Sequence, residues 1–288
     1  MRYSIYMLIL FVLLGQSCSR ENEKKNNSHI QIDDLGRKVV VPDEPKRIIS
    51  LTPSITEFLY TFTDTAKIIG RSLWCDYPAA VKKIPALNSY PVDIEAIVLL
   101  KPDLVFVKNG MITVQELDKL EQLHIPVFVQ KYDLLKEIEA STRTLVHITK
   151  GDSAKMEQWI QSIHMDTLQH PFEHKRAIAI VSASPVYVFG KETFVSELME
   201  QAGAKNVVEV LDSAYPTVDV EYILRTDPEV FLFSSKDQQK LFFETYPLLK
   251  KSTGYKTNQL FVIDDSVLSR PGIRLPVLKD SLVSIFGR

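Results

Sequence analysis

Glycine is scarce in this chain of 288 residues. It has ten glycines, and the closest two, Gly190 and Gly203, are 13 positions apart. A Rossmann dinucleotide fingerprint and a Walker A loop each need at least two glycines within a few positions. The sequence therefore excludes both of these nucleotide-binding signatures.

An excess of positive charge and a set of paired cysteines are also missing. The chain has 34 Lys and Arg against 36 Asp and Glu, a net charge of −2, so its composition indicates no nucleic-acid partner. Its two cysteines are Cys18 and Cys75. If Cys18 is modified, no intramolecular disulfide is left, and we expect Cys75 to be a buried structural thiol rather than a nucleophile.

The first 17 residues have the features of an export signal. Arg2 precedes an uncharged apolar run, Ile5 to Leu14, which is too short to span a bilayer comfortably. The segment ends in the letters LGQSC at Cys18, which resembles the lipid-attachment site of bacterial lipoproteins. We expect a signal peptide at 1–17 and a lipidated, solvated tether at 18–30. A simple secretory peptide and an uncleaved anchor are the alternatives.

Short β-rich runs alternate with helical patterns along the rest of the chain, which is typical of parallel β-α-β units. Strands are predicted at 47–51, 68–69, 104–107, 127–129, 177–181, 187–189, 207–208, 230–233 and 260–263. Helices are predicted at 94–100, 114–123, 134–149, 193–202, 220–225 and 241–249. A further helix of about 16 residues, Ser153 to Leu168, would span about 24 Å.

These patterns predict an α/β protein of two Rossmann-like lobes. Each lobe has a parallel sheet, a single long helix joins the two, and a ligand cleft lies between them. The expected boundaries are 31–150 for the first lobe, 151–171 for the connecting helix and 172–288 for the second lobe.

An internal repeat supports two similar lobes. Residues 92–107 match residues 218–233, with Val, Asp, Glu, Ile and Pro recurring in register. Each copy is predicted to be a helix with an aspartate N-cap (Asp93, Asp219), stopped by a proline and followed by a buried strand. Any short helix before a strand looks similar, but five matches at one point in two series favour duplication.

Three segments of the first lobe resemble the helical-backbone class (class III) of ABC-transporter substrate-binding proteins. They read RIISLTPSITE at 47–57, IGRSLWCDYP at 69–78 and LLKPDLV at 99–105. This class includes vitamin B12, ferric-siderophore and haem carriers. The resemblance covers about residues 32 to 288, and its run from Cys75 to Pro78 favours the cobalamin-binding branch.

The resemblance implies a lipid-anchored receptor of the cell envelope, in the periplasm or at the extracytoplasmic face. Such a protein captures a corrinoid and delivers it to an ABC importer; a ferric siderophore or haem is the alternative ligand. We expect a monomer that binds no nucleic acid.

Ligand-binding residues are expected in loops at the carboxyl ends of the strands. Aromatic faces and a few polar groups suit a planar macrocycle. In the family motif Trp74 matches an aromatic ligand contact, and Ser54 lies where the first loop touches ligand. Read locally, Ser54 is also the N-cap of a capping box with Glu57. The predicted ligand-binding residues are Ser54, Trp74, Tyr77, Tyr90, Lys108, Phe189, Tyr215, Asp265 and Arg270, with ordinary packing as the alternative for each aromatic and solvation for Arg270.

Glu95 and Glu221 are the paired acids of the repeat. Each lies in the first turn of its predicted helix, where a carboxylate interacts favourably with the helix dipole. The resemblance adds a compatible role, since in the family one acid on each lobe meets arginines of the two permease subunits. We therefore predict Glu95 and Glu221 as transporter-docking residues.

Other classes of function are less well supported. Of six histidines, only His170 and His174 have a one-face helical spacing, and Pro171 lies between them, so no metal site and no resident cofactor are predicted. No compact nucleophile–base motif is present, so an enzyme is not predicted. Asp76 and Asp265 could form a pair of catalytic acids if they faced each other across the cleft. An adhesion or signalling module is the remaining alternative. Pro276 falls where the last helix should be running, which leaves the start of that helix open.

Overall fold

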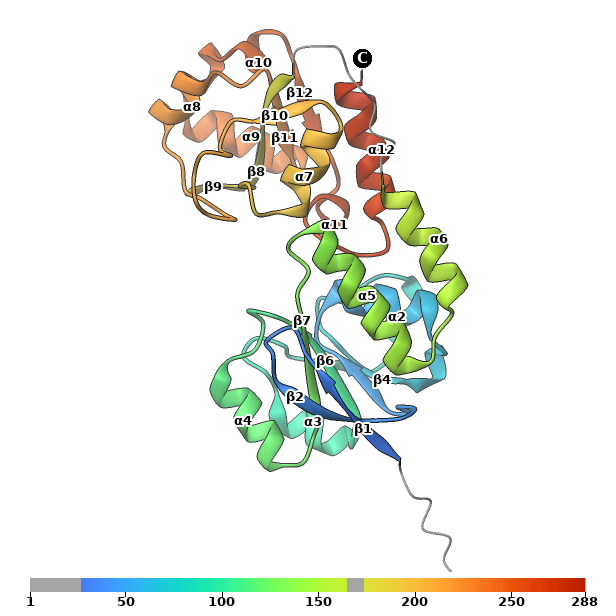
Figure 1. Ribbon diagram of the computed structural model, residues 1–288. Helices are drawn as coiled ribbons and strands as arrows, with labels where there is room; N and C mark the ends of the chain where they lie inside the picture. Colours follow the sequence, from blue (N-terminus) through green and yellow to red (C-terminus); the bar gives the residue numbers. More distant parts are fainter. Residues whose placement is uncertain (1–26, 165–173, 288) are drawn as a thin grey trace, which may run out of the picture.

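The protein has two α/β lobes stacked along its long axis (Figure 1). This computed structural model describes residues 27–164 and 174–287. The predicted signal peptide, Cys18 and most of the predicted tether lie outside the described residues. Within the described ranges, no helix is both long and apolar enough to cross a membrane.

The first lobe contains a parallel sheet with the strand order β5-β4-β3-β6-β7. Its strands are β3 (Ile48–Ser50), β4 (Ile68–Ser72), β5 (Ala86–Leu87), β6 (Leu104–Lys108) and β7 (Val127–Gln130). Helices α2 (Pro53–Phe62), α3 (Ile94–Leu100) and α4 (Val114–Gln122) connect them, with 3-10 turns η1 (Thr65–Lys67) and η2 (Ala79–Lys83). A hairpin of β1 (Ser28–Ile32) and β2 (Lys38–Pro42) precedes the sheet, so the predicted tether is wrong from Ser28 onward.

The second lobe repeats this plan with the strand order β10-β8-β11-β12, and β9 pairs antiparallel with β8. Its strands are β8 (Lys175–Ala183), β9 (Val186–Val188), β10 (Ala204–Asn206), β11 (Val230–Phe233) and β12 (Leu260–Val262). Its helices are α7 (Phe194–Gln201), α8 (Val220–Thr226), α9 (Lys236–Thr245), α10 (Thr253–Lys256) and α11 (Asp265–Leu268), with a 3-10 turn η3 (Pro247–Lys251).

Two of the predicted elements in the second lobe are misplaced. The strand expected at 207–208 is β10, which ends at Asn206, and the helix expected at 241–249 is α9, which ends at Thr245. Val207, Val208 and Leu249 are buried in the lobe core, but each lies beyond the end of the regular element that was predicted to contain it.

The sequence repeat occupies the same place in both sheets. β6 lies between β3 and β7, and β11 lies between β8 and β12. The preceding helices α3 and α8 have seven residues each, and the side chains of Asp93 and Asp219 cap them by accepting from the backbone N–H of Ala96 (2.9 Å) and Tyr222 (2.7 Å). The predicted caps are therefore confirmed.

One apolar core cluster contains residues of both lobes, and each lobe also has a cluster of its own. Along β6, Leu104 and Phe106 point into this core while the residues between them face the other side of the sheet. The equivalent residues of β11, Val230 and Leu232, point into the same core. Strands buried on both faces need helices on both faces, and here the shared side is covered by the helices that join the lobes.

Three helices lie along this shared side: α5 (Leu135–Thr149), α6 (Ser153–Ile163) and α12 (Leu275–Phe286). The predicted connecting helix is α6, which begins at Ser153 as expected but ends at Ile163, because His164 has an extended backbone. α5 packs on α6 and α2, and α12 packs on α6 and α7. Pro276 is in the first turn of α12, where its missing N–H costs no intrahelical bond, so the proline is compatible with the helix start.

Candidate functional site

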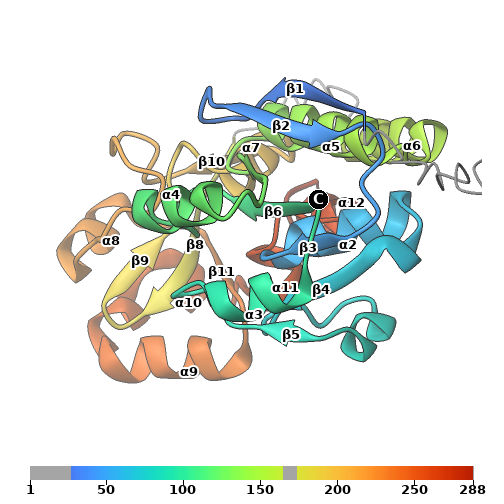
Figure 2. The same ribbon diagram turned by 90° about the horizontal axis from the view of Figure 1, so that it is seen from below.

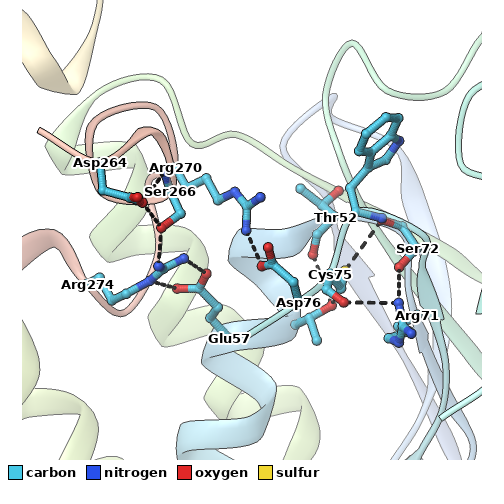
Figure 3. Close-up of polar contacts among 12 residues, drawn as sticks. Thr52, Glu57, Arg71, Ser72, Cys75, Asp76, Asp264, Ser266, Arg270 and Arg274 are labelled. Carbon is cyan, nitrogen blue, oxygen red and sulfur yellow. Dashed lines mark hydrogen bonds and ion pairs between the residues drawn. The ribbon is translucent and has the colours of Figure 1, made fainter. Parts of the chain in front are cut away.

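The lobes meet where the α11–α12 segment approaches α2 and the loop after β4. Two ion pairs join them there, from Arg270 Nη1 to Asp76 Oδ1 (2.5 Å) and from Arg274 Nη2 to Glu57 Oε1 (2.7 Å) (Figure 3). The hydrogen bond to Arg270 holds the pKa of Asp76 below its ordinary value of 3.8. Asp76 therefore faces an arginine of the opposite lobe, rather than facing Asp265 as an acid pair.

Glu57 is the buried centre of this contact. Its side chain is 1% exposed, and burial raises its pKa above the ordinary 4.5 although Arg274 opposes the shift. A Cβ atom at Gly272 would lie 2.6 Å from Glu57 Oε2, so glycine is required for the α11–α12 loop to come this close. Arg274 also stacks over the ring of Tyr77, 4.6 Å from its centroid.

The predicted capping box is wrong. The N-cap of α2 is Thr52, Pro53 follows it, and Ser54 lies inside the helix with 3% of its surface exposed. Thr52 Oγ1 accepts instead from the backbone N–H of Lys108 (3.0 Å), and the carboxylate of Glu57 is bound by Arg274. Ser54 is thus a buried helix residue, and the ligand contact predicted for it stays a prediction.

The loop after β4 presents exposed aromatic side chains from a well-braced backbone. Arg71 donates to the carbonyl oxygens of Ser72 and Cys75, both at 3.0 Å. Trp74 is 65% exposed and Tyr77 is 43% exposed. The Cys75 thiol is buried and its pKa is raised by that burial, which confirms the predicted structural cysteine.

A second group of predicted residues gathers where β6 and β7 end. Lys108 Nζ contacts Asp133 Oδ1 at 2.7 Å. In the second lobe, Tyr215 packs edge-on against the buried ring of Phe189, with centroids 5.9 Å apart. Burial, together with the charge of Asp133, raises the pKa of Tyr215 to about 12. Asp133 belongs to the first lobe and Tyr215 to the second, so both lobes contribute side chains to this group.

Two further predicted ligand contacts, Tyr90 and Asp265, have exposed side chains. Tyr90 is 68% exposed in the loop before α3. Asp265 is exposed in α11, where it accepts from Ser269 Oγ at 2.8 Å. The structure adds Glu57, Asp76, Asp133 and Arg274 as polar residues at the junction. Asp76 and Asp133 follow β4 and β7 in sequence, so their strand-end positions were a usable signal; Glu57 and Arg274 had no such signal.

The electrostatic character of the junction follows from these pairs. The cations Lys108, Arg270 and Arg274 each contact a carboxylate. Side-by-side guanidinium and carboxylate groups offer both donors and acceptors without a net charge. Together with exposed aromatic faces, such a surface suits an apolar ligand with neutral polar groups on its rim.

The two predicted docking acids lie on separate lobes. Glu95 is in the first turn of α3 and Glu221 in the first turn of α8, and both are exposed. Across residues 27–164 and 174–287, no group of three or more His, Cys, Asp or Glu side chains is arranged to hold a metal ion.

Comparison with known proteins gives one family match. A sequence family described as "Periplasmic binding protein" matches residues 48–267. The chain is 26% identical over 279 residues to an uncharacterized ABC transporter substrate-binding lipoprotein, YvrC, of Bacillus subtilis, covering 90% of this chain and 86% of the relative. It is 27% identical over 198 residues to the vitamin B12-binding protein of Pectobacterium atrosepticum, covering 65% and 71%.

Solved structures share the fold. The periplasmic vitamin B12 binding protein BtuF of Vibrio cholerae superposes with a TM-score of 0.72 at 22% identity, covering 85% of this chain and 98% of that one. A periplasmic heme binding protein of Pseudomonas aeruginosa gives 0.71 at 19% identity, covering 84% and 92%. At these identities the likeness establishes the two-lobed architecture, with parallel sheets, that was predicted.

Proposed function

The chain belongs to the periplasmic binding protein family, whose members serve ABC importers outside the cytoplasm, and from that premise we propose that it captures a corrinoid and passes it to a permease. The observation that carries the ligand class is the pairing of Lys108, Arg270 and Arg274 with acids at the lobe junction. A corrinoid has an apolar macrocycle with neutral carboxamides on its rim, and each carboxamide both donates through its NH2 group and accepts at its oxygen.

Haem and ferric siderophores are the alternative ligands of this family. Haem carries carboxylates, which bind best to arginines that have no other anionic partner. Here such a ligand would have to displace Asp76 from Arg270 or the buried Glu57 from Arg274. The three paired cations therefore favour a neutral ligand over an anionic one.

Titration of the purified protein with cyanocobalamin, haem and several ferric siderophores tests the ligand. We expect cyanocobalamin to bind most tightly and to be recovered chemically unchanged, since the protein is proposed to be a carrier and not an enzyme. If no ligand bound more tightly than a Kd of about 100 μM, equivalent to about 5.5 kcal/mol, the proposed ligand class would be wrong. Tighter binding of haem than of cyanocobalamin would favour the alternative.

Glu95 and Glu221 are proposed to contact basic residues of the two permease subunits. Replacing both with alanine is expected to leave ligand affinity unchanged and to abolish stimulation of the importer's ATPase activity, because each lobe loses its charged contact. Asp118→Ala with Glu200→Ala is a matched control, since it removes one exposed acid from a helix of each lobe. Loss of ligand affinity, or equal loss of stimulation in the control, would contradict the docking role.

The same proposal includes attachment of the carrier to a membrane through a lipid on Cys18. The supporting observations are the export signal of the sequence and a relative that is named a lipoprotein. The mass of the mature protein tests this directly, because acylation at Cys18 adds the mass of its fatty-acid chains.

A further inference from the structure

Strand β1 of the β1–β2 hairpin has its aliphatic side chains on the outer face. In β1, Ile30 and Ile32 point outward and are each 63% exposed, whereas the polar His29 and Gln31 alternate with them on the inner face. A strand packed on a core normally shows the opposite alternation. The polar inner face also destabilises the fold, because His29 Nε2 is buried without a hydrogen-bond partner.

The outward face continues onto the second strand. Val40 lies directly opposite Ile30 in the hairpin and is 56% exposed, and Lys38 lies opposite Ile32. Val39 and Val41, which alternate with them, are buried in the core, so the hairpin cannot turn over to hide its apolar side. Val40 also lines a groove of about 410 Å³, to which Ile125 and Pro126 contribute.

The position of the hairpin along the chain indicates what covers this face. Nine residues lie between Cys18 and Ser28, the first residue of β1, and the ten Cα–Cα steps from one to the other span at most about 36 Å. A lipid on Cys18 would therefore keep the hairpin close to the bilayer. Aliphatic side chains beside a lysine suit the membrane interface, where the lysine stem lies along apolar surface and its ammonium group reaches the headgroups.

A second copy of the chain fits this face less well. Stable interfaces between proteins use about 20–30 residues on each side, whereas this face is built on three aliphatic side chains and one lysine. We propose that the outward face of the hairpin (Ile30, Ile32, Val40 and Lys38) rests on the membrane surface when the carrier is not docked. Figure 2 places the hairpin and α3, which carries Glu95, on opposite sides of the first lobe, so this contact and docking use different faces.

The inference rests on the proposed lipid tether, but it can be tested without natural acylation. The chain from Ser19, with an N-terminal hexahistidine tag in place of the lipid, is bound to vesicles of phosphatidylethanolamine, phosphatidylglycerol and a nickel-chelating lipid. A polarity-sensitive fluorophore is attached at Ile32→Cys; Cys75 is buried and stays unlabelled. The matched control is Val114→Cys, a 67% exposed apolar residue of the same lobe.

On binding to vesicles, we expect the label at position 32 to shift to shorter wavelength and to be quenched by nitroxide-bearing lipids, while the label at position 114 stays unchanged. Ile30→Asn with Val40→Thr should abolish the response at position 32. No response there, or the same response at both positions, would overturn the proposal. A response that disappears when the protein is diluted on the vesicle surface would identify a second copy as the occupant. Cyanocobalamin affinity is measured on the same variants, so failure of the ligand proposal is seen separately.

Discussion

Replacing Glu57 with alanine is expected to lower the free energy of unfolding by about 3–5 kcal/mol. The substitution leaves the guanidinium of Arg274, which is 17% exposed, without its carboxylate partner at the contact between the lobes. It also opens a space under Gly272, which packs directly against Glu57. Chemical denaturation followed by circular dichroism measures the loss.

Glu57→Gln tests the charge of this side chain separately from its contact with Arg274. Glu57→Gln keeps the side-chain volume and an oxygen that can accept from Arg274, so it should cost less than Glu57→Ala, at most about 1.5 kcal/mol. Burial raises the pKa of the Glu57 carboxyl. The native state also holds this proton more tightly than the unfolded chain, so the contribution of Glu57 to stability should be greatest below pH 4.5 and fall as the pH rises through its raised pKa. Glu57→Gln should remove that slope.

An exposed pair supplies the control for Glu57. Glu244 Oε1 lies 3.9 Å from Lys240 Nζ on the surface of α9, and both side chains are largely exposed. Glu244→Ala should cost no more than about 0.5 kcal/mol. If Glu57→Ala were equally mild, the ion pair with Arg274 would not hold the lobes together.

Trp159→Ala is the second substitution with a large expected effect, about 3–5 kcal/mol. Trp159 lies on α6, packs edge-on against Phe58 of α2 with centroids 4.9 Å apart, and donates from Nε1 to the carbonyl oxygen of Ile273 (3.0 Å). It thus contacts the first lobe, the connecting helix and the segment before α12. Trp159→Phe keeps much of the packing and loses the hydrogen bond, so about 1–2 kcal/mol is expected. Thermal and chemical unfolding measure both changes.

The chain's other tryptophan gives the opposite expectation. Trp74 is 65% exposed, so Trp74→Ala should change stability by no more than about 0.5 kcal/mol. Trp74 is proposed to contact the macrocycle, so Trp74→Ala should weaken cyanocobalamin binding about tenfold. An aromatic contact contributes about 1 kcal/mol in addition to the effect of the area it buries. A Trp74→Ala variant with unchanged affinity would remove this residue from the binding site. Trp159→Ala with unchanged stability would show that the lobes do not depend on α6 packing.

Local patterns accounted for much of the fold. Asp93 and Asp219 cap their helices as predicted, since an aspartate followed by a short helical pattern needs only the next turn to act as a cap. The capping box predicted at Ser54 was wrong because its second member has a distant partner. Glu57 binds Arg274, which is 217 positions away, and no local sequence pattern contains that partner.

The sequence by itself determined two similar α/β lobes and the family to which the chain belongs. Periodicity, caps and the alternation of strands and helices along the chain depend on neighbouring residues, and the repeat 126 positions apart carries the same alternation into both sheets. Only the tertiary structure decided which charges meet at the lobe junction, that Ser54 is buried, and that Ile30 and Ile32 face outward. These outcomes depend on how distant segments approach one another, and that is set by the packing of the whole core rather than by any stretch of adjacent residues.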